Sequence, residues 1–483
     1  MVFSSHVFLF WFLPVALTAY YLAPRKAKAL VLTLFSYLFY GWSNPLFVVL
    51  MFVCTAVNFG AGLYLVRGSG IGSPENGQYP PLPAGARTRR QKWVLWFSIV
   101  ASLGMLGFFK YWNFGIENFE RLLELFGMAP EGGFHFIKVI LPLGISFYTF
   151  QAMSYTIDVY RGHARAITSF TNFACYVSMF PQLVAGPIVR YQDVADQLRS
   201  RRHTISKCTT GAAYLVIGLA QKVLLANPCG RVADTCFNAA SRDMFDAWTG
   251  LFAYSFQIYY DFSGYSNMAI GLGLLMGFRF LKNFDSPYKA RGITDFWRRW
   301  HISLSSWLRD YLYVPLGGNR RGPSRTYINL MLVMLIGGLW HGASWNFILW
   351  GGGHGVWLAL ERRFSRKGKR FLPPVLSIAL TYLGVSLLWV PFRADDWGTT
   401  LEYYRSLLPG ADGLHGLVGA AITNGYLMLS MVAAAVLVFC APPAWKLARN
   451  VGPLKATLLL LAFLLTVILL SSQSYNPFIY FIF

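Results

Sequence analysis

Long apolar runs recur from one end of this sequence to the other, separated by short segments that carry lysine and arginine. A helix needs about twenty apolar residues to cross the hydrocarbon core of a bilayer. Of the 483 residues, 55% are apolar and only 13% are charged, which is too little polar surface for a soluble globular protein. We therefore expect an all-α polytopic membrane protein of about ten to twelve transmembrane helices, with the lipid bilayer as its solvent.

The basic residues account for a formal net charge of +22. A strongly basic protein attracts nucleic acid, but here the cations lie in short clusters between apolar segments, as they do in the cytoplasmic loops of membrane proteins. We expect no nucleic-acid partner. The alternation of charge between successive loops predicts that both termini lie outside the cytoplasm.

Ten spans follow from this pattern. They are expected at residues 7–22, 29–40, 45–66, 93–109, 139–160, 210–226, 248–277, 373–390, 426–445 and 454–470. Residues 167–189 contain FPQLVAGPI, whose prolines and glycine break a helix at membrane depth, and they predict a re-entrant segment covered by protein. We expect one integral-membrane domain, 1–483, with N-terminal helices (1–160), a catalytic core (161–390) and C-terminal helices (391–483).

The six cysteines lack the spacing of metal ligands, and no metal site is expected. Cys229 and Cys236 share a predicted outer loop, where they either form a disulfide or remain free thiols. The N-terminus has no basic region and no small-residue cleavage site, so its first apolar run is expected to be a retained helix.

The segment 294–357 has an unusual density of histidine and tryptophan. It holds three of the eight histidines, at positions 301, 341 and 354, and seven of the sixteen tryptophans. From Asp295 the spacing predicts a helix with two faces. One face carries Trp297, His301, Leu304 and Leu308, and the other carries Arg298, Ser305 and Arg309.

This predicted helix is too short and too basic to span, so we expect it at the cytoplasmic interface, with its arginines toward headgroups or an anionic ligand. His301 is then either a polar residue at the boundary of an amphipathic anchor or part of a cavity wall that faces substrate. The following LGGNRRG turn places Asn319, Arg320 and Arg321 beside glycines that permit positive φ. It suits the phosphates of a nucleotide-bearing donor, or it is a plain cytoplasmic loop.

His341 follows a nearly uncharged helix, at 327–340, within or just beyond an apolar span. Ionisable groups inside a membrane are costly and usually mark a functional path. Gly337 and Gly338 allow another backbone to approach, and Gly342 loosens the helix end. His341 is the strongest candidate for chemistry, with a structural histidine as the alternative.

Two further polar residues stand in apolar surroundings. His354 lies among glycines on a helical face with Trp350 and Trp357, which close helix packing explains as well as chemistry does. Asp261, in the motif YYDFSGYSNMAIG, needs a buried partner. It either lines the reaction path or bonds structurally to a basic residue.

The known sequence signatures of nucleophilic, nucleotide-binding and metalloprotease sites do not accompany these residues. One or two histidines in a membrane cavity suit general-base activation of a hydroxyl, because imidazole titrates near neutral pH. Composition does not distinguish this chemistry from a proton-coupled transporter.

Several long motifs resemble the membrane-bound O-acyltransferase family, and within it the membrane subunits of bacterial alginate O-acetylation. The resemblance is carried by LPLGISFYTFQAMSYTIDVYRG from Leu141, FPQLVAGPIVR from Phe180, YYDFSGYSNMAIGLGLLMGF from Tyr259, FWRRWHISLSSWLRDYLYVPLGGNR from Phe296, GGLWHGASWNFILWGGGHG from Gly337, and the terminal PFIYFIF. It extends over nearly the whole chain.

The resemblance implies a central tunnel that brings a cytoplasmic donor, acetyl-CoA, to a catalytic histidine, which matches His341. His301 matches the family's second site residue. Trp300 and Trp340, which precede these histidines, are expected at the donor or substrate site together with Asp261, Asn319, Arg320, Arg321 and His354. No bound cofactor is implied.

The same resemblance places the protein in a bacterial inner membrane. A periplasmic or membrane-anchored acetyltransferase partner and a polysaccharide synthesis and export complex would receive the acetyl group there. Alginate is the expected polysaccharide, with cellulose as another. The alternatives are D-alanyl transfer to teichoic acid, acylation of lipid or protein, and transport of an acyl group or glycan without catalysis.

Overall fold

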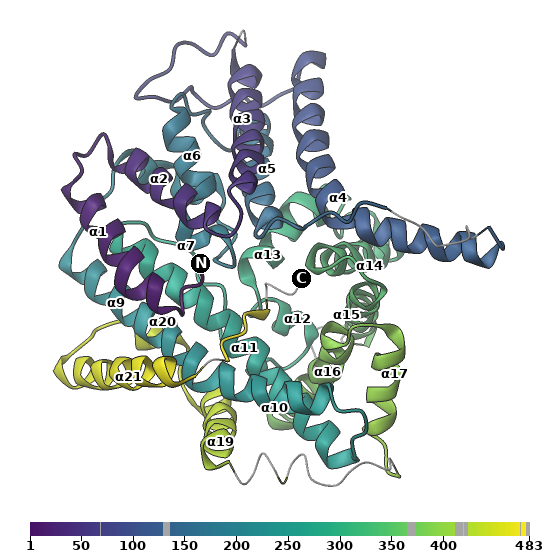
Figure 1. The fold of residues 1–483 in the computed structure, drawn as a ribbon. Coiled ribbons are helices and arrows are strands. Elements are labelled where there is room, and N and C mark those ends of the chain that lie inside the picture. Colours follow the sequence, from purple (N-terminus) through teal and green to yellow (C-terminus); the bar gives the residue numbers. More distant parts are fainter. Residues whose placement is uncertain are drawn as a thin grey trace. The chain divides into compact units, whose positions relative to one another are not determined.

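The structure is a computed structural model that describes residues 1–67, 69–128, 136–364, 372–410, 419, 424–473 and 475–479 (Figure 1). The described residues form helices joined by turns, with two isolated β-bridges and no β-strand. The chain divides into two compact units. One comprises residues 1, 7–203 and 276–280, and the other comprises residues 2–6, 204–275 and 281–483.

The helices of the first unit follow the apolar runs of the sequence. They are η1 (Val7–Phe12), α1 (Leu13–Leu22), α2 (Lys28–Gly41), α3 (Leu46–Val66), α4 (Arg89–Leu125), α5 (Ile145–Arg161), α6 (Phe170–Ser178), α7 (Phe180–Leu183) and α8 (Tyr191–Arg199). The first three predicted spans are confirmed to within one residue at each end. Helix α5 is buried along residues 145–159, where it packs against α3 and α4.

Helix α4 is longer than the sequence pattern predicted. A capping box between Thr88 and Gln91 fixes its start, and it continues to Leu125 instead of ending at residue 109. Glu117, Glu120 and Glu124, which follow the predicted span 93–109, therefore lie on the helix. Glutamate has high helix propensity, so a fall in hydropathy did not mark the end of the helix.

The predicted break in 167–189 is confirmed. Helix α6 ends at Ser178 and α7 begins at Phe180, with Pro181 in its first turn. Every residue from 173 to 189 is buried. The backbone groups freed by the break are thus covered by protein, as such a break requires within a membrane.

The second unit contains the histidine-rich segment. Its helices are α9 (Ile205–Ala220), η2 (Gln221–Ala226), α10 (Asn227–Phe237), α11 (Met244–Leu275), η3 (Pro287–Lys289), α12 (Ile293–Trp297), α13 (Ile302–Leu308), η4 (Arg309–Tyr313), α14 (Gly322–His341), α15 (Trp345–Phe364), α16 (Pro374–Arg393), α17 (Trp397–Ser406), α19 (Gly425–Cys440), α20 (Ala444–Leu447) and α21 (Pro453–Ser472). Helices α9 and α11 pack closely because they meet at glycines. A Cβ on Gly218 would lie 2.4 Å from the carbonyl oxygen of Gly264.

The prediction of an outer loop after residue 226 is wrong. The helix continues through the π-helical turn η2 into α10, which ends at Phe237. Cys229 and Cys236 lie on α10 as buried free thiols. Seven residues of helix separate them by about 10.5 Å along the axis, which is too far for a disulfide.

Five described helices are long and apolar enough to cross a membrane: Leu46–Val66, Arg89–Leu125, Ile205–Phe237, Pro374–Arg393 and Pro453–Ser472. Three shorter apolar helices, Val7–Leu22, Lys28–Gly41 and Gly425–Cys440, accompany them. This composition agrees with the expected polytopic all-α membrane protein. The basic segment 365–371 and most of the loop before α19 lie outside the described residues.

A histidine-lined cavity as candidate active site

A cavity of about 300 Å³ lies among α12, α13, α14 and α15 of the second unit. It is lined by Thr294, Trp297, Arg298, Leu304, Ser305, Leu308, Arg309, Tyr313, Asn319, Leu330, Val333, Met334, Gly337, His341, Trp350, Leu358 and Arg362. Its volume is at the lower end of the range for small-molecule sites. Both predicted faces of the segment after Asp295 contribute to its wall.

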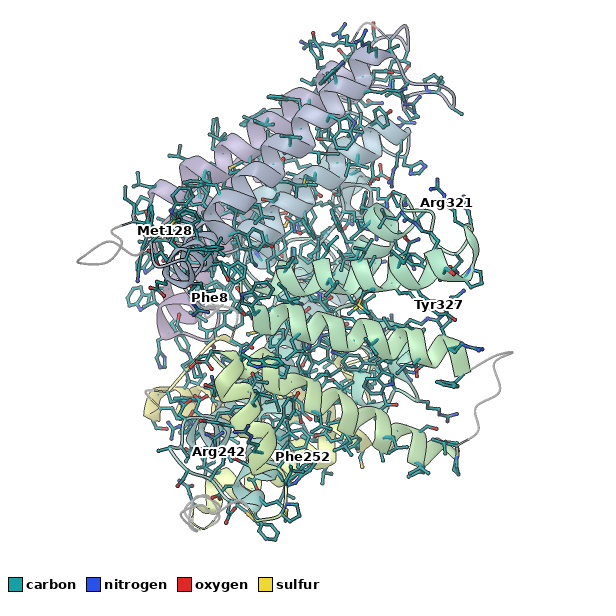
Figure 2. The ribbon with its side chains drawn as sticks, turned by 90° about the vertical axis from the view of Figure 1, so that its right-hand side faces the viewer. Phe8, Met128, Arg242, Phe252, Arg321 and Tyr327 are labelled. Carbon is teal, nitrogen blue, oxygen red and sulfur yellow. The ribbon has the colours of Figure 1, made fainter. Side chains whose placement is uncertain are left out.

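The cavity follows the length of two antiparallel helices. Gly338 of α14 lies beside Phe347 of α15, and Gly355 lies beside Met331 further along the pair. From Leu330 to His341 the wall extends about 16 Å, at 1.5 Å per helical residue. One end is apolar and contains His341. Figure 2 shows Arg321 and Tyr327 near the opposite, N-terminal end of α14.

His341 is the last residue of α14 and is 5% exposed. Its position depends on Gly338, one of the two glycines expected to allow close approach of another backbone, and on Gly342, whereas Gly337 makes only an ordinary contact. A Cβ on Gly338 would lie 2.2 Å from the carbonyl oxygen of Phe347, and one on Gly342 would lie 1.9 Å from the Phe347 ring. The imidazole lies between aromatic rings, with centroids 5.2 Å from Trp350 and 5.3 Å from Phe392. It therefore reaches the cavity from a dry aromatic wall.

His301 does not continue a helix from Asp295, and this expectation is wrong. Helix α12 ends at Trp297, the chain turns, and α13 begins at Ile302 with His301 as its N-cap at φ 43°. This left-handed conformation is uncommon for residues other than glycine. It is held from outside the segment, because the side-chain oxygen of Asn283 accepts hydrogen bonds from the backbone N–H and hydroxyl of Ser303.

The break changes the environment of His301. The side chain is fully buried instead of lying at a polar boundary. Its Nδ1 is 3.2 Å from Asn283 Oδ1, and an amide oxygen only accepts hydrogen bonds, so the network assigns the proton to Nδ1. Nε2 then carries a lone pair and has no hydrogen-bond partner among the described residues. Burial lowers the pKa of His301 to about 3, so the ring stays neutral.

The two histidines are neighbours, with ring centroids 6.3 Å apart. Trp340 lies beside both rings, 5.0 Å from His341 and 5.9 Å from His301. His301 and Trp340 do not line the cavity themselves. The structure thus brings His341, His301 and Trp340 together, with His341 alone of the three at the cavity surface.

Trp300 and His354 belong to the aromatic packing behind the cavity. Trp300 is buried and stacks on Phe296, and its centroid is 5.0 Å from that of Trp389. His354 is fully buried, with its ring centroid 4.9 Å from Trp350. These positions favour the packing interpretation of His354.

Asp261 bonds to a buried basic residue, which was one of the two interpretations of its sequence. Its side chain forms a buried ion pair with Lys222 at 2.7 Å, and it accepts a hydrogen bond from the backbone N–H of Ile479 at 2.9 Å. The same Lys222 donates to the carbonyl oxygen of Pro477. Asp261 therefore joins α11 to η2 and to residues 477–479, and it does not line the cavity.

The arginines that line the cavity are not those of the predicted phosphate-binding turn. The LGGNRRG turn has the expected positive φ at Gly317 and Gly318, and Asn319 lines the cavity, but Arg320 and Arg321 do not. The arginines in the described wall are Arg298, Arg309 and Arg362. Arg362 was missed, although it follows Trp350, His354 and Leu358 at four-residue steps on α15, a spacing that marks one helical face.

No group of three His, Cys, Asp or Glu side chains in the described parts of the chain is arranged to hold a metal ion. The cavity instead combines the imidazole of His341 with three guanidinium groups, of which Arg362 lies toward the N-terminal end of α14. Such an arrangement suits proton transfer next to a bound anionic ligand.

Comparison with known proteins identifies the class. Residues 130–371 match the membrane-bound O-acyltransferase (MBOAT) family. The chain is 42% identical to the probable alginate O-acetylase AlgI of Pseudomonas putida, over the full length of both. It is 46% identical to the probable alginate O-acetylase AlgI of Pseudomonas aeruginosa over 84% of this chain and 75% of that protein. It is 35% identical to the peptidoglycan O-acetyltransferase of Helicobacter pylori over 86% of this chain and 81% of that protein.

The fold and these similarities define the chain as a polytopic membrane enzyme of the class that transfers acyl groups to hydroxyls. The chain is a member of the membrane-bound O-acyltransferase family.

Proposed function

We propose that this protein transfers an acetyl group from acetyl-CoA on the cytoplasmic side of a bacterial inner membrane, with His341 as the general base. The observation that carries the proposal is that His341 and three arginines line one cavity, with His341 at the C-terminal end of α14 and Arg362 toward its N-terminal end. The apolar end suits an acetyl thioester, and the arginines suit the phosphates of coenzyme A. The whole chain acts as one integral-membrane acyltransferase domain.

In this mechanism the acceptor hydroxyl gives its proton to His341 as its oxygen attacks the thioester carbonyl. The tetrahedral intermediate then collapses, the carbon–sulfur bond breaks, and the proton passes from the imidazolium to the departing thiolate of coenzyme A. A new ester and free coenzyme A result. General-base assistance of this kind contributes about 10² to 10⁴ in rate, and orientation in the cavity contributes more.

His301 acts on the acceptor in this proposal. With its proton on Nδ1 toward Asn283, the ring presents only a lone pair at Nε2. It can accept a hydrogen bond from a hydroxyl but cannot donate one to a thioester carbonyl. His301 would therefore hold the acceptor hydroxyl beside His341. Trp340 keeps the two rings at their fixed separation.

The acceptor follows from the relatives. Two are named as probable alginate O-acetylases, so we take a secreted polysaccharide, alginate, as the final acceptor, reached through a periplasmic acetyltransferase partner of a synthesis and export complex. The similarity to a peptidoglycan O-acetyltransferase makes peptidoglycan the second candidate. D-alanyl transfer to teichoic acid is the alternative. In it both the donor and the acceptor differ from those of alginate acetylation.

The test uses full-length protein in proteoliposomes with radiolabelled acetyl-CoA outside, at the face where the donor binds. His341→Ala is expected to lower acetyl transfer by about 10²-fold or more. His163→Ala, at an exposed position in the first unit, is the matched control and should retain the wild-type rate. A folded His341→Ala protein with wild-type transfer would contradict the assignment of the base. Labelled D-alanine on a carrier protein in place of acetyl-CoA separates the two donors.

A further inference from the structure

A second cavity lies in the same unit, between helices that are candidates to span the membrane. It has a volume of about 240 Å³ and a mostly apolar wall. It is lined by Val216, Ile217, Ala220, Gln221, Leu224, Leu225, Tyr259, Tyr260, Ser286, Leu437, Val438, Ala441, Pro442, Pro443, Ala444, Leu447, Leu459 and Ala462. It shares no lining residue with the cavity at His341.

One edge of this cavity is the short helix α20. Ala444 and Leu447 of α20 line the cavity. Trp445, between them in sequence, is surrounded by a cluster of three basic side chains. The side-chain nitrogens of Lys282 and Lys446 lie 4.5 Å and 5.3 Å from the centre of the Trp445 ring, and the guanidinium carbon of Arg449 lies 5.2 Å from it. Tryptophan and basic residues together are typical of the interface between membrane and water.

The charge of this cluster is only partly balanced. Asp285 accepts hydrogen bonds from Lys282 at 2.7 Å and from the indole N–H of Trp445 at 2.9 Å. Partial burial raises the pKa of Asp285, but these hydrogen bonds outweigh it, so the pKa is lowered and the carboxylate stays charged. Lys446 and Arg449 are exposed and form no ion pair within the described residues.

Another cation lies at the same rim, beside the turn that precedes α20. Lys289 donates a hydrogen bond to the carbonyl oxygen of Ala441 at 3.0 Å, where α19 has ended and the chain turns through Pro442 and Pro443. An apolar cavity open between α9, α19 and α21 thus has a cationic rim at one end. Its chemistry is that of an acyl chain joined to an anionic headgroup.

We propose that this cavity binds one anionic phospholipid, with an acyl chain between α9, α19 and α21 and the phosphate beside Lys446 and Arg449. Basic pockets between membrane helices recognise anionic headgroups in this way. Asp285 balances the charge of Lys282. The positive charges of Lys446 and Arg449 remain, and they complement the negative phosphodiester of the lipid. The site is separate from acyl transfer, and its occupant comes from the surrounding bilayer.

The test measures binding of phosphatidylglycerol to the purified full-length protein by native mass spectrometry, with phosphatidylcholine as the neutral competitor. We expect the wild type to retain one phosphatidylglycerol. The double variant Lys446→Gln/Arg449→Gln should bind it roughly thirtyfold more weakly, the combined effect of two basic residues at an anionic surface. The matched control, Arg25→Gln/Lys26→Gln, removes the same charge from an exposed loop and should bind as the wild type does.

A second pair of variants tests the acyl chain. Ala462→Phe fills the cavity from α21 and should abolish retention of phosphatidylglycerol, whereas Ala456→Phe, on an exposed position of the same helix, should not. Glycerol phosphate, which has the headgroup charge and no chain, should fail to compete. Unchanged binding in either Lys446→Gln/Arg449→Gln or Ala462→Phe, or effective competition by glycerol phosphate, would overturn the proposal.

Discussion

The two cavities of the second unit differ in the groups that line them. The wall at His341 comes from helices that meet at glycines, so the backbone of α14 touches that of α15, and two buried histidines have fixed neighbours. The wall of the second cavity comes from apolar side chains and a proline turn, and its described lining contains no histidine. A reacting group requires rigid surroundings, because a misplacement of about 1 Å is costly in catalysis. A bound lipid that exchanges with the bilayer does not require such rigid surroundings.

Among changes that leave both histidines in place, the largest expected effect comes from forcing α14 and α15 apart. A Cβ on Gly351 would lie 2.3 Å from the carbonyl oxygen of Met334, whereas one on the neighbouring Gly352 makes only an ordinary 3.7 Å contact. Gly351→Ala should therefore destabilise the α14–α15 pair by about 1–3 kcal/mol and lower acetyl transfer more than tenfold. Gly352→Ala is the matched control and should change stability by less than about 1 kcal/mol. Thermal unfolding and transfer rates check both, and equal effects would mean that helix contact does not position His341.

A smaller effect should follow from removing the support of His301. Asn283→Ala leaves the Nδ1–H group of His301 and the backbone N–H of Ser303 without their acceptor, at a cost of about 1–3 kcal/mol. We expect acetyl transfer to fall about tenfold while the KM for acetyl-CoA stays unchanged, because His301 is proposed to hold the acceptor. A raised KM with unchanged kcat would instead place His301 at the donor.

His301 also predicts a dependence of stability on pH. Its pKa is about 3 in the folded protein because of burial, against 6.5 for an ordinary histidine. Between these values the unfolded chain binds a proton that the folded chain does not, so stability falls as the pH is lowered from about 6.5 toward 3. His301→Gln, which does not titrate, should flatten this dependence, measured as unfolding temperature at pH 7 and pH 5. An identical slope in both proteins would contradict the neutral buried imidazole.

The smallest expected effect concerns the basic end of the cavity. Arg362→Gln should raise the KM for acetyl-CoA severalfold without changing kcat, because Arg362 lines the cavity, and the effect should shrink at high salt. Arg320→Gln removes the same charge from an exposed position outside the lining and should leave KM unchanged. A larger effect from Arg320 than from Arg362 would restore the LGGNRRG turn as the phosphate site.

The apolar pattern predicted most helices because burial in lipid or protein selects the same residues that the pattern detects. The first three spans depend only on local sequence and are found where expected. The helix before His341 is also found, although it begins at Gly322, five residues earlier than predicted. The break before His301 could not be predicted, because Asn283, which fixes it, is remote in sequence. The choice between Arg320 and Arg362 likewise depends on how α15 packs against α14. The four-residue spacing places Arg362 on the helical face of Trp350, but local sequence does not show that this face lines a cavity.

The contacts of residues 475–479 have a consequence for the order of biosynthesis. Lys222 and Asp261 are buried near the middle of the chain, yet part of their hydrogen bonding is supplied by Pro477 and Ile479. Asn476 also bonds to the backbone of Ser4. A nascent chain long enough to contain the residues of both cavities therefore still lacks part of this polar core until residues 475–479 have been synthesised. Formation of the cavities and completion of the polar core are thus separate steps along the chain.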